Sequence, residues 1–137
     1  VTTHRWPDPD ALASSAAMCA LLRHQLKDAT VSLSIKGEVV GGINTNFVKL
    51  ADLAIVPWDE AKLLAEHPEA YDAIVMLDVQ PAFSYSPLPA GVMPTAIVDH
   101  HRSRGRKPAI AFTDIRVDVG ATASIVFSYL MELEVPI

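Results

Sequence analysis

The 137-residue sequence has one cysteine and no long apolar run. Because Cys19 has no partner within the chain, an internal disulfide is excluded, and nothing indicates an oxidising compartment. No apolar stretch approaches the roughly 20 residues of a membrane span, and no charged-then-apolar signal segment begins the chain. We therefore expect a cytoplasmic location and no contact of this segment with a membrane.

Basic residues are also scarce, since 11 Lys and Arg stand against 16 Asp and Glu. The net charge of −5 argues against a broad basic face that grips long duplex nucleic acid. It leaves room for an acidic cluster that binds cations, and it favours a small substrate or a strand end. Four of the basic residues fall within "RSRGRK" at 102–107, which is either a substrate-binding loop or a solvated loop that balances local acid.

Half of the residues are hydrophobic, which is enough for one compact domain over 1–137. The first residue is Val rather than Met, and the chain stops just after a helical pattern. We therefore expect a piece of a longer polypeptide, truncated at both ends. The composition leaves a homodimer open.

Hydrophobic spacing predicts helices that alternate with short buried strands. Prolines and a glycine within 80–94 favour a loop there. Together these patterns predict an α/β fold with a mainly parallel sheet flanked by helices. The expected helices are 11–26, 44–50, 58–66 and 120–132, and the expected strands are 31–35, 73–77, 95–98 and 109–112.

Acidic and imidazole side chains fall where predicted strands end, and ligands collect at this edge of a parallel sheet. A first strand, cut off at Val1, would lead through "HRWPDPD" into the first helix. Several carboxylates at one edge repel one another unless cations compensate, which favours two divalent metals over one. The residues expected at this edge are His4, Asp8, Asp10, Asp78, Asp99, His100 and His101.

The opening motif also reads as a turn before a helix. Pro7 and Pro9 hold the backbone extended, and Asp10 sits where a helix N-cap belongs. Capping and metal ligation are compatible roles for Asp10. Near the last helix, Thr122 and Ser124 either hydrogen-bond a carboxylate or the substrate, or simply initiate the helix.

Four motifs, in order, resemble those of the DHH phosphoesterases. "HRWPDPDALAS" resembles their first motif, "LDV" their isolated aspartate, "VDHHRS" the motif that names them, and "GATASIV" their fourth segment. The resemblance spans the whole chain and implies a Rossmann-like catalytic domain. It also implies a second, smaller substrate-binding domain and one further metal-ligating aspartate, neither of which has a counterpart in this sequence.

The resemblance further implies roles for individual residues. His4 and Asp8 would hold one metal, Asp10 and His100 the other, and Asp78 would bridge them. Asp99 would orient an imidazole, while His101 and Arg102 would meet the substrate phosphate. The resemblance implies two Mn²⁺ ions, with Mg²⁺ or Co²⁺ as alternatives.

The function implied is hydrolysis of phosphate esters in short oligonucleotides or small nucleotides, as in nano-RNases and phosphoadenosine-phosphate phosphatases, by a metal-activated water. A cyclic-di-AMP phosphodiesterase, an inorganic pyrophosphatase and a non-catalytic nucleotide-binding member are the alternatives. An arginine directly after the double histidine favours the cyclic-di-AMP branch over the nano-RNases. Retention of mutually repulsive carboxylates argues against a non-catalytic member.

Overall fold

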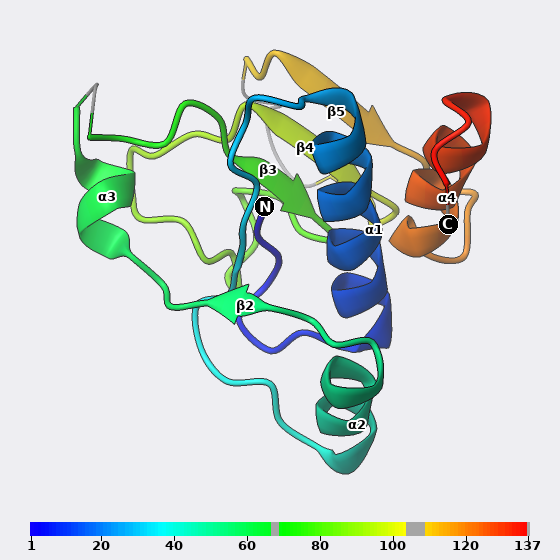
Figure 1. The fold of residues 1–137 in the computed structure, drawn as a ribbon. Helices are drawn as coiled ribbons and strands as arrows, with labels where there is room; N and C mark the ends of the chain where they lie inside the picture. The colour runs from blue at the N-terminus through cyan, green and yellow to red at the C-terminus, as the bar shows by residue number, and fades with distance from the viewer. Residues whose placement is uncertain (67–68, 104–108, 137) are drawn as a thin grey trace.

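The structure combines helices with short parallel strands, which confirms the predicted α/β fold (Figure 1). The structure is a computed structural model that describes residues 1–66, 69–103 and 109–136. Its helices are α1 (Pro9–Gln25), α2 (Gly42–Leu50), α3 (Glu60–Leu64) and α4 (Thr122–Glu132). Its strands are β1 (Leu33–Ser34), β2 (Ile55–Val56), β3 (Val75–Leu77), β4 (Ala96–Asp99) and β5 (Phe112–Ile115).

The first two residues of the chain join two parallel sheets. One sheet pairs β1 with β2, and the other has the order β3-β4-β5. The Val1 carbonyl accepts a 3.0 Å hydrogen bond from the Ser34 amide, while Thr2 donates one backbone bond to β3 and accepts another, each of 2.9 Å. The expected first strand is therefore present as a single parallel bridge, between Thr2 and Met76.

The central strands are buried on both faces, which is why their sequences lack alternation. Leu77 and Val98 pack beneath α1 and α4, which lie side by side (Figure 1). Met76 and Ile97 face the opposite side, where Phe83 covers them. Phe83 belongs to the 80–94 loop, which has neither helix nor strand, as predicted.

The edge strand β5 begins three residues later than the predicted 109–112. Parallel pairing with β4 sets its register, in which Ala96 lies opposite Phe112 and Asp99 opposite Ile115. Phe112 is exposed on this edge, whereas Ile110 packs against the cluster around Phe83. Most of the apolar run at 109–112, which suggested a strand, therefore belongs to the connection that precedes β5.

The remaining differences concern short elements. The strand β2 was not predicted, because two residues before Pro57 give no periodic signal. Helix α3 is shorter than the predicted 58–66: the Asp59 side chain accepts a hydrogen bond from the Lys62 amide and starts the helix there, and the extended backbone of Ala65 ends it. Among the described residues, no helix combines the length and apolar character needed to cross a membrane.

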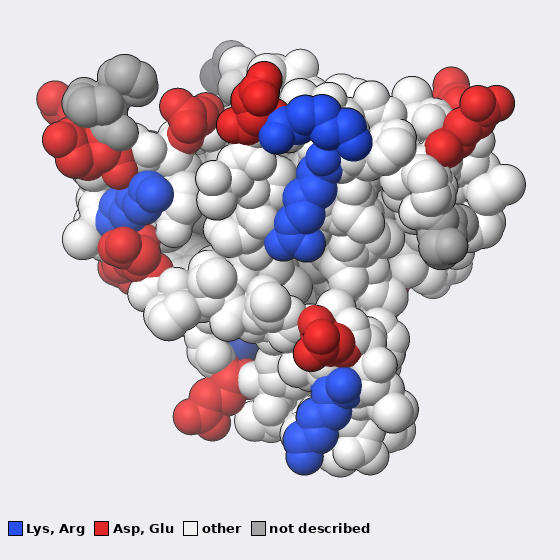
Figure 2. All heavy atoms as spheres, in the orientation of Figure 1, with Lys and Arg blue, Asp and Glu red and all other residues white. Residues whose placement is uncertain are grey.

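Charged side chains are dispersed on the face drawn in Figure 2. Basic side chains of the described residues are few there and lie among acidic and neutral ones, without forming a broad basic patch.

A polar cluster fastens the edge strand to α4. The Arg116 guanidinium donates to both oxygens of Asp114, at 2.7 to 3.1 Å, and the Tyr129 hydroxyl donates to the same carboxylate. Hydrogen bonds from Arg116 lower the pKa of Asp114 below its ordinary value. Tyr129 lies on α4, so this carboxylate links two elements of the fold.

We expect the Leu130→Ala variant to lose about 2–5 kcal/mol of unfolding free energy. Leu130 is 5% exposed and packs in the cluster between α4 and the sheet. The matched control is Leu50→Ala, because Leu50 is 89% exposed and should change stability by less than about 0.5 kcal/mol. Urea unfolding of both variants checks this, and equal losses would contradict the described core.

Asp114 should make stability depend on pH in the acid range. Because its folded-state pKa lies below the unfolded value, its stabilising effect is present above the ordinary carboxylate pKa and is lost as pH falls through the lowered one. Asp114→Asn should therefore lose less stability than the unchanged protein between pH 7 and pH 3. Urea unfolding at both pH values, with exposed Asp28→Asn as the control, measures the difference.

Candidate metal centre

The carboxyl ends of β3 and β4 bring the predicted site residues together. Asp78 directly follows β3, and Asp99 is the last residue of β4. His4 and Asp8 lie in the segment that leads into α1, and His100 and His101 follow β4. The topology therefore gathers three chain segments at one edge of the sheet, as parallel α/β sheets commonly do.

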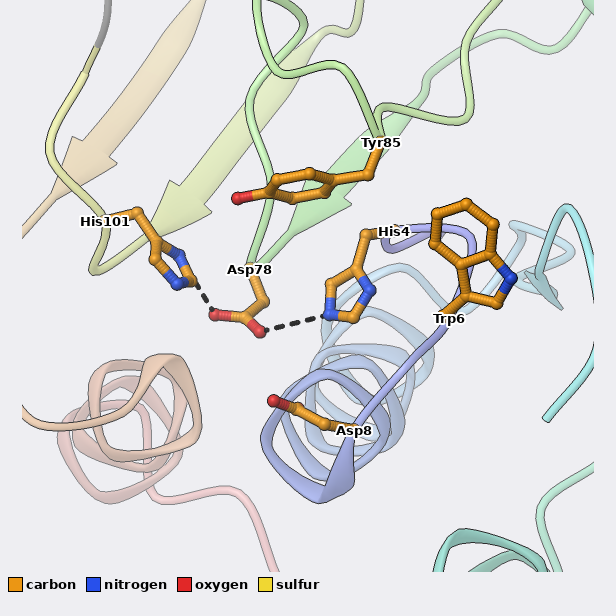
Figure 3. Close-up of a pocket in the computed structure, with 6 residues that line it drawn as sticks. All are labelled: His4, Trp6, Asp8, Asp78, Tyr85 and His101. Carbon is orange, nitrogen blue, oxygen red and sulfur yellow. Dashed lines mark ion pairs between the residues drawn. The ribbon is translucent and has the colours of Figure 1, made fainter. Parts of the chain in front are cut away.

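Asp78 is the centre of this group. The residue is 1% exposed, and its backbone adopts φ +60°, a conformation uncommon for residues other than glycine. One carboxylate oxygen lies 3.6 Å from His4 Nε2, and the other lies 3.6 Å from His100 Nε2 (Figure 3 draws the His4 contact). The Thr122 hydroxyl donates a 2.7 Å hydrogen bond to Asp78, which is one of the two roles that the sequence left open for Thr122.

Two groups of ligand atoms share Asp78. The first consists of His4, Asp8 and Asp78, and the second of Asp78, His100 and His101, with the ligand atoms of each group within 4.8 Å of one another. Imidazole nitrogen and carboxylate oxygen suit divalent ions such as Mn²⁺, Co²⁺ or Zn²⁺. The donor set therefore fits divalent metal ions, in agreement with the metal site that the sequence predicts.

Asp8, not Asp10, is the N-cap of α1, so the predicted capping role of Asp10 was wrong. The Asp8 carboxylate accepts a 2.9 Å hydrogen bond from the Ala11 amide, and Pro9 occupies the first helical position. Proline fits there because its missing N–H would have no partner within the helix. One motif thus starts the helix and presents a carboxylate to the site.

Asp10 caps a different helix. Its two oxygens accept 2.8 Å hydrogen bonds from the Thr122 and Ala123 amides at the first turn of α4. One oxygen also lies 3.7 Å from His100 Nε2. Each carboxylate oxygen has two lone pairs, so these bonds leave capacity for a ligand. The structure thus places Asp10 beside His100, as the predicted ligand pair requires. The second group of clustered ligand atoms, however, contains His101 and not Asp10.

His100 is oriented by the backbone. Its Nδ1 lies 3.1 Å from the carbonyl oxygen of Val119, an acceptor that selects the tautomer with the proton on Nδ1. The lone pair is then on Nε2, which faces Asp10 and Asp78. Metal-binding histidines generally have such a partner on the second ring nitrogen.

Asp99 holds the double histidine in place. It is fully buried, and Oδ1 accepts from the His100 amide at 2.8 Å and lies 2.8 Å from His101 Nδ1. Its Oδ2 accepts a 2.6 Å bond from Gln80, whose amide nitrogen also lies 3.0 Å from the carbonyl oxygen of His101. These bonds fix both the backbone and the imidazole of His101.

A pocket of about 250 Å³ opens beside these residues (Figure 3). Its walls combine candidate metal ligands with aromatic side chains. The lining residues are His4, Trp6, Asp8, Asp78, Tyr85 and His101. Arg102 is exposed and does not line this pocket, and Arg104, Arg106 and Lys107 lie outside the described residues.

Comparison with known proteins agrees with this geometry. The profile of the DHH family, N-terminal domain, matches residues 1–136. The chain belongs to the DHH family. Its members are in general metal-dependent phosphoesterases.

A relative of this DHH domain occurs in Methanocaldococcus jannaschii. The uncharacterized protein MJ1633 is 29% identical over 137 residues, which cover 98% of this chain. The chain spans about a quarter (26%) of that protein's length.

Neighbouring groups shift the proton affinities in the DHH site. Burial acts to raise the pKa of Asp78, but His4 and the Thr122 hydroxyl outweigh it and leave the pKa below its ordinary value. Burial raises the pKa of Asp10, helped by the charge of Asp78 and opposed by the α4 amides. Burial alone would lower the pKa of His101, but Asp99 raises it overall. The lowered pKa favours the ionised form of Asp78, whereas the raised pKa of Asp10 works against ionisation there.

Gln80 is a site residue that sequence reasoning missed. It is 5% exposed and bonds both Asp99 and the His101 backbone. A polar amide between Val79 and Pro81 was the available signal. The signal was weak, because the same segment reads equally well as a solvated loop.

Thr122→Val should destabilise the protein by about 1–3 kcal/mol, because a buried Asp78 oxygen loses its donor while the volume stays similar. Thr122→Ser retains a hydroxyl and should recover part of the loss. Thr113→Val is the matched control, since Thr113 is exposed on β5 and should change little. Chemical unfolding measures all three, and an equal loss in the control would refute the assignment.

Proposed function

We propose that the protein containing this domain hydrolyses phosphate esters of short oligonucleotides or small nucleotides with the help of two divalent metal ions, Mn²⁺ being our first choice. The observation that carries the proposal is the shared position of Asp78 between two groups of ligand atoms. Membership of the DHH family supports the broader phosphoesterase assignment.

The proposed ligand sets divide the carboxylates. His4 and Asp8 would hold one ion, Asp10 and His100 would hold the other, and Asp78 would contribute to both. When bound, such ions lower the pKa of a water molecule and offset the charge of the phosphate. His100 keeps Nε2 directed at the carboxylates because Val119 binds Nδ1.

His101 is the proposed contact for the substrate phosphate. Asp99 engages its Nδ1 at 2.8 Å, so Nε2 is the ring nitrogen left for a phosphate oxygen. Gln80 donates a hydrogen bond to Asp99 and so helps to hold the carboxylate that orients the His101 ring. Arg102 is proposed to reach the substrate from the exposed loop after the double histidine.

The substrate class follows from the charge and the pocket. An acidic chain disfavours long duplex nucleic acid, whose binding needs many basic contacts. A pocket of about 250 Å³ that includes aromatic walls suits a nucleotide-sized group. We therefore favour short oligonucleotides or small nucleotides over cyclic-di-AMP and pyrophosphate, which remain the competing substrates to test.

The test is hydrolysis by the full-length protein, with Mn²⁺, of a labelled dinucleotide, phosphoadenosine phosphate, cyclic-di-AMP and pyrophosphate. Asp78→Asn keeps the side-chain shape and tolerates φ +60°, but it removes the shared charge. Replacing a residue that merely supports a ligand costs about 10–100-fold, so this variant should lose more than about 100-fold of kcat/KM.

Asp52→Asn is the matched control, because Asp52 is exposed and also has a positive φ, of 48°. It should retain full activity, and a chelator should abolish turnover of the unchanged protein. Cleavage of none of the four substrates by protein that has bound two metals would overturn the enzyme proposal in favour of a nucleotide-binding member.

A further inference from the structure

The indole of Trp6 is exposed although the loop that carries it is held in place. The Trp6 side chain is 63% exposed, whereas the adjacent Pro7 is fully buried. The Arg5 amide donates a 3.4 Å bond to the Tyr85 carbonyl, and the Asn44 side chain donates a 3.1 Å bond to the Pro7 carbonyl. These contacts on both sides of Trp6 fix its backbone.

Gly37 adds a close approach to the same loop. Its φ is +117°, and a Cβ atom at this position would lie 2.7 Å from the Arg5 carbonyl oxygen. The segment around Gly37 therefore packs directly against the backbone that precedes Trp6. A large apolar side chain on such a restrained loop is presented to solvent in a defined place.

Trp6 shares its pocket with the candidate metal ligands. In Figure 3, Trp6 and His101 lie at opposite ends of the group, with His4 and Asp78 between them. The Tyr85 ring lies along one side and meets the His4 ring edge-on, with centroids 5.8 Å apart. One end of the pocket is therefore aromatic, and the other is rich in carboxylate and imidazole groups.

We propose that Trp6 stacks on the base of a nucleoside phosphate whose phosphate lies at the Asp78 and His101 end of the pocket. This inference rests on the proposed function and adds a residue that selects the substrate class. A planar indole face attracts any nucleobase, because stacking does not depend on the pattern of donors and acceptors at the base edge. Trp6 thus selects nucleotides over phosphates without a base, and it does not choose among the bases.

The test compares adenosine 5′-monophosphate with ribose 5-phosphate, which has the same sugar phosphate and no base. Calorimetric titration of the full-length protein with bound Mn²⁺ gives both dissociation constants without turnover. Stacking on an aromatic side chain is worth about 1–3 kcal/mol, so the unchanged protein should bind the nucleotide about 5- to 150-fold more tightly.

Trp6→Leu should remove most of this preference while ribose 5-phosphate still binds, which also shows that the phosphate end is intact. Trp6→Phe keeps an aromatic face and should recover part of the preference. Trp58→Leu is the matched control, since Trp58 contacts Lys36 and Glu60 outside the pocket, and it should leave the preference unchanged.

A preference that survives in Trp6→Leu would overturn the inference, because the base would then be held elsewhere. Equal binding of the two phosphates by the unchanged protein would also overturn it and would leave Trp6 as a contact for another protein surface. These outcomes are separate from those of the hydrolysis test. Turnover without base preference refutes only the role of Trp6, whereas base preference without turnover refutes only the enzyme proposal.

Discussion

Mutual repulsion among Asp8, Asp10 and Asp78 is the constraint on which the rest of the site depends. Three carboxylates at one sheet edge are costly to hold together unless protons, hydrogen bonds or cations compensate. The protein supplies backbone amides to Asp8 and Asp10 and a hydroxyl to Asp78. The imidazoles of His4 and His100 also lie beside these carboxylates, so nitrogen and oxygen donors suited to cations are gathered in one place.

Much of this arrangement could be predicted from the sequence. Buried strands that end in Asp78 and Asp99 mark the functional edge, because parallel strands place their carboxyl ends together. The order of the motifs supplied the family, which the match over residues 1–136 confirms. The roles of the individual ligands stay predictions.

The features that could not be predicted depend on contacts between distant segments. The bonds from α4 to Asp10 span more than a hundred residues of sequence, and local pattern carries no trace of them. The capping role was assigned to Asp10 instead of Asp8 because both residues follow the same local rule. The sequence did not single out Gln80 or Trp6, because both lie in segments predicted to be loops. Only the folded chain shows that Gln80 contacts Asp99 and that Trp6 lines the pocket.

The two bonds that Asp10 accepts from α4 couple two properties of the molecule. The same carboxylate completes the first turn of a core helix and faces the cluster of ligands. An ion bound by Asp10, as proposed, would therefore weaken the hydrogen bonds that this carboxylate accepts from the α4 amides, and the position of α4 would in turn affect the affinity for that ion. Thermodynamic linkage makes this influence equal in both directions. Under the proposed ligand set, cation occupancy and the packing of α4 against α1 would therefore depend on each other.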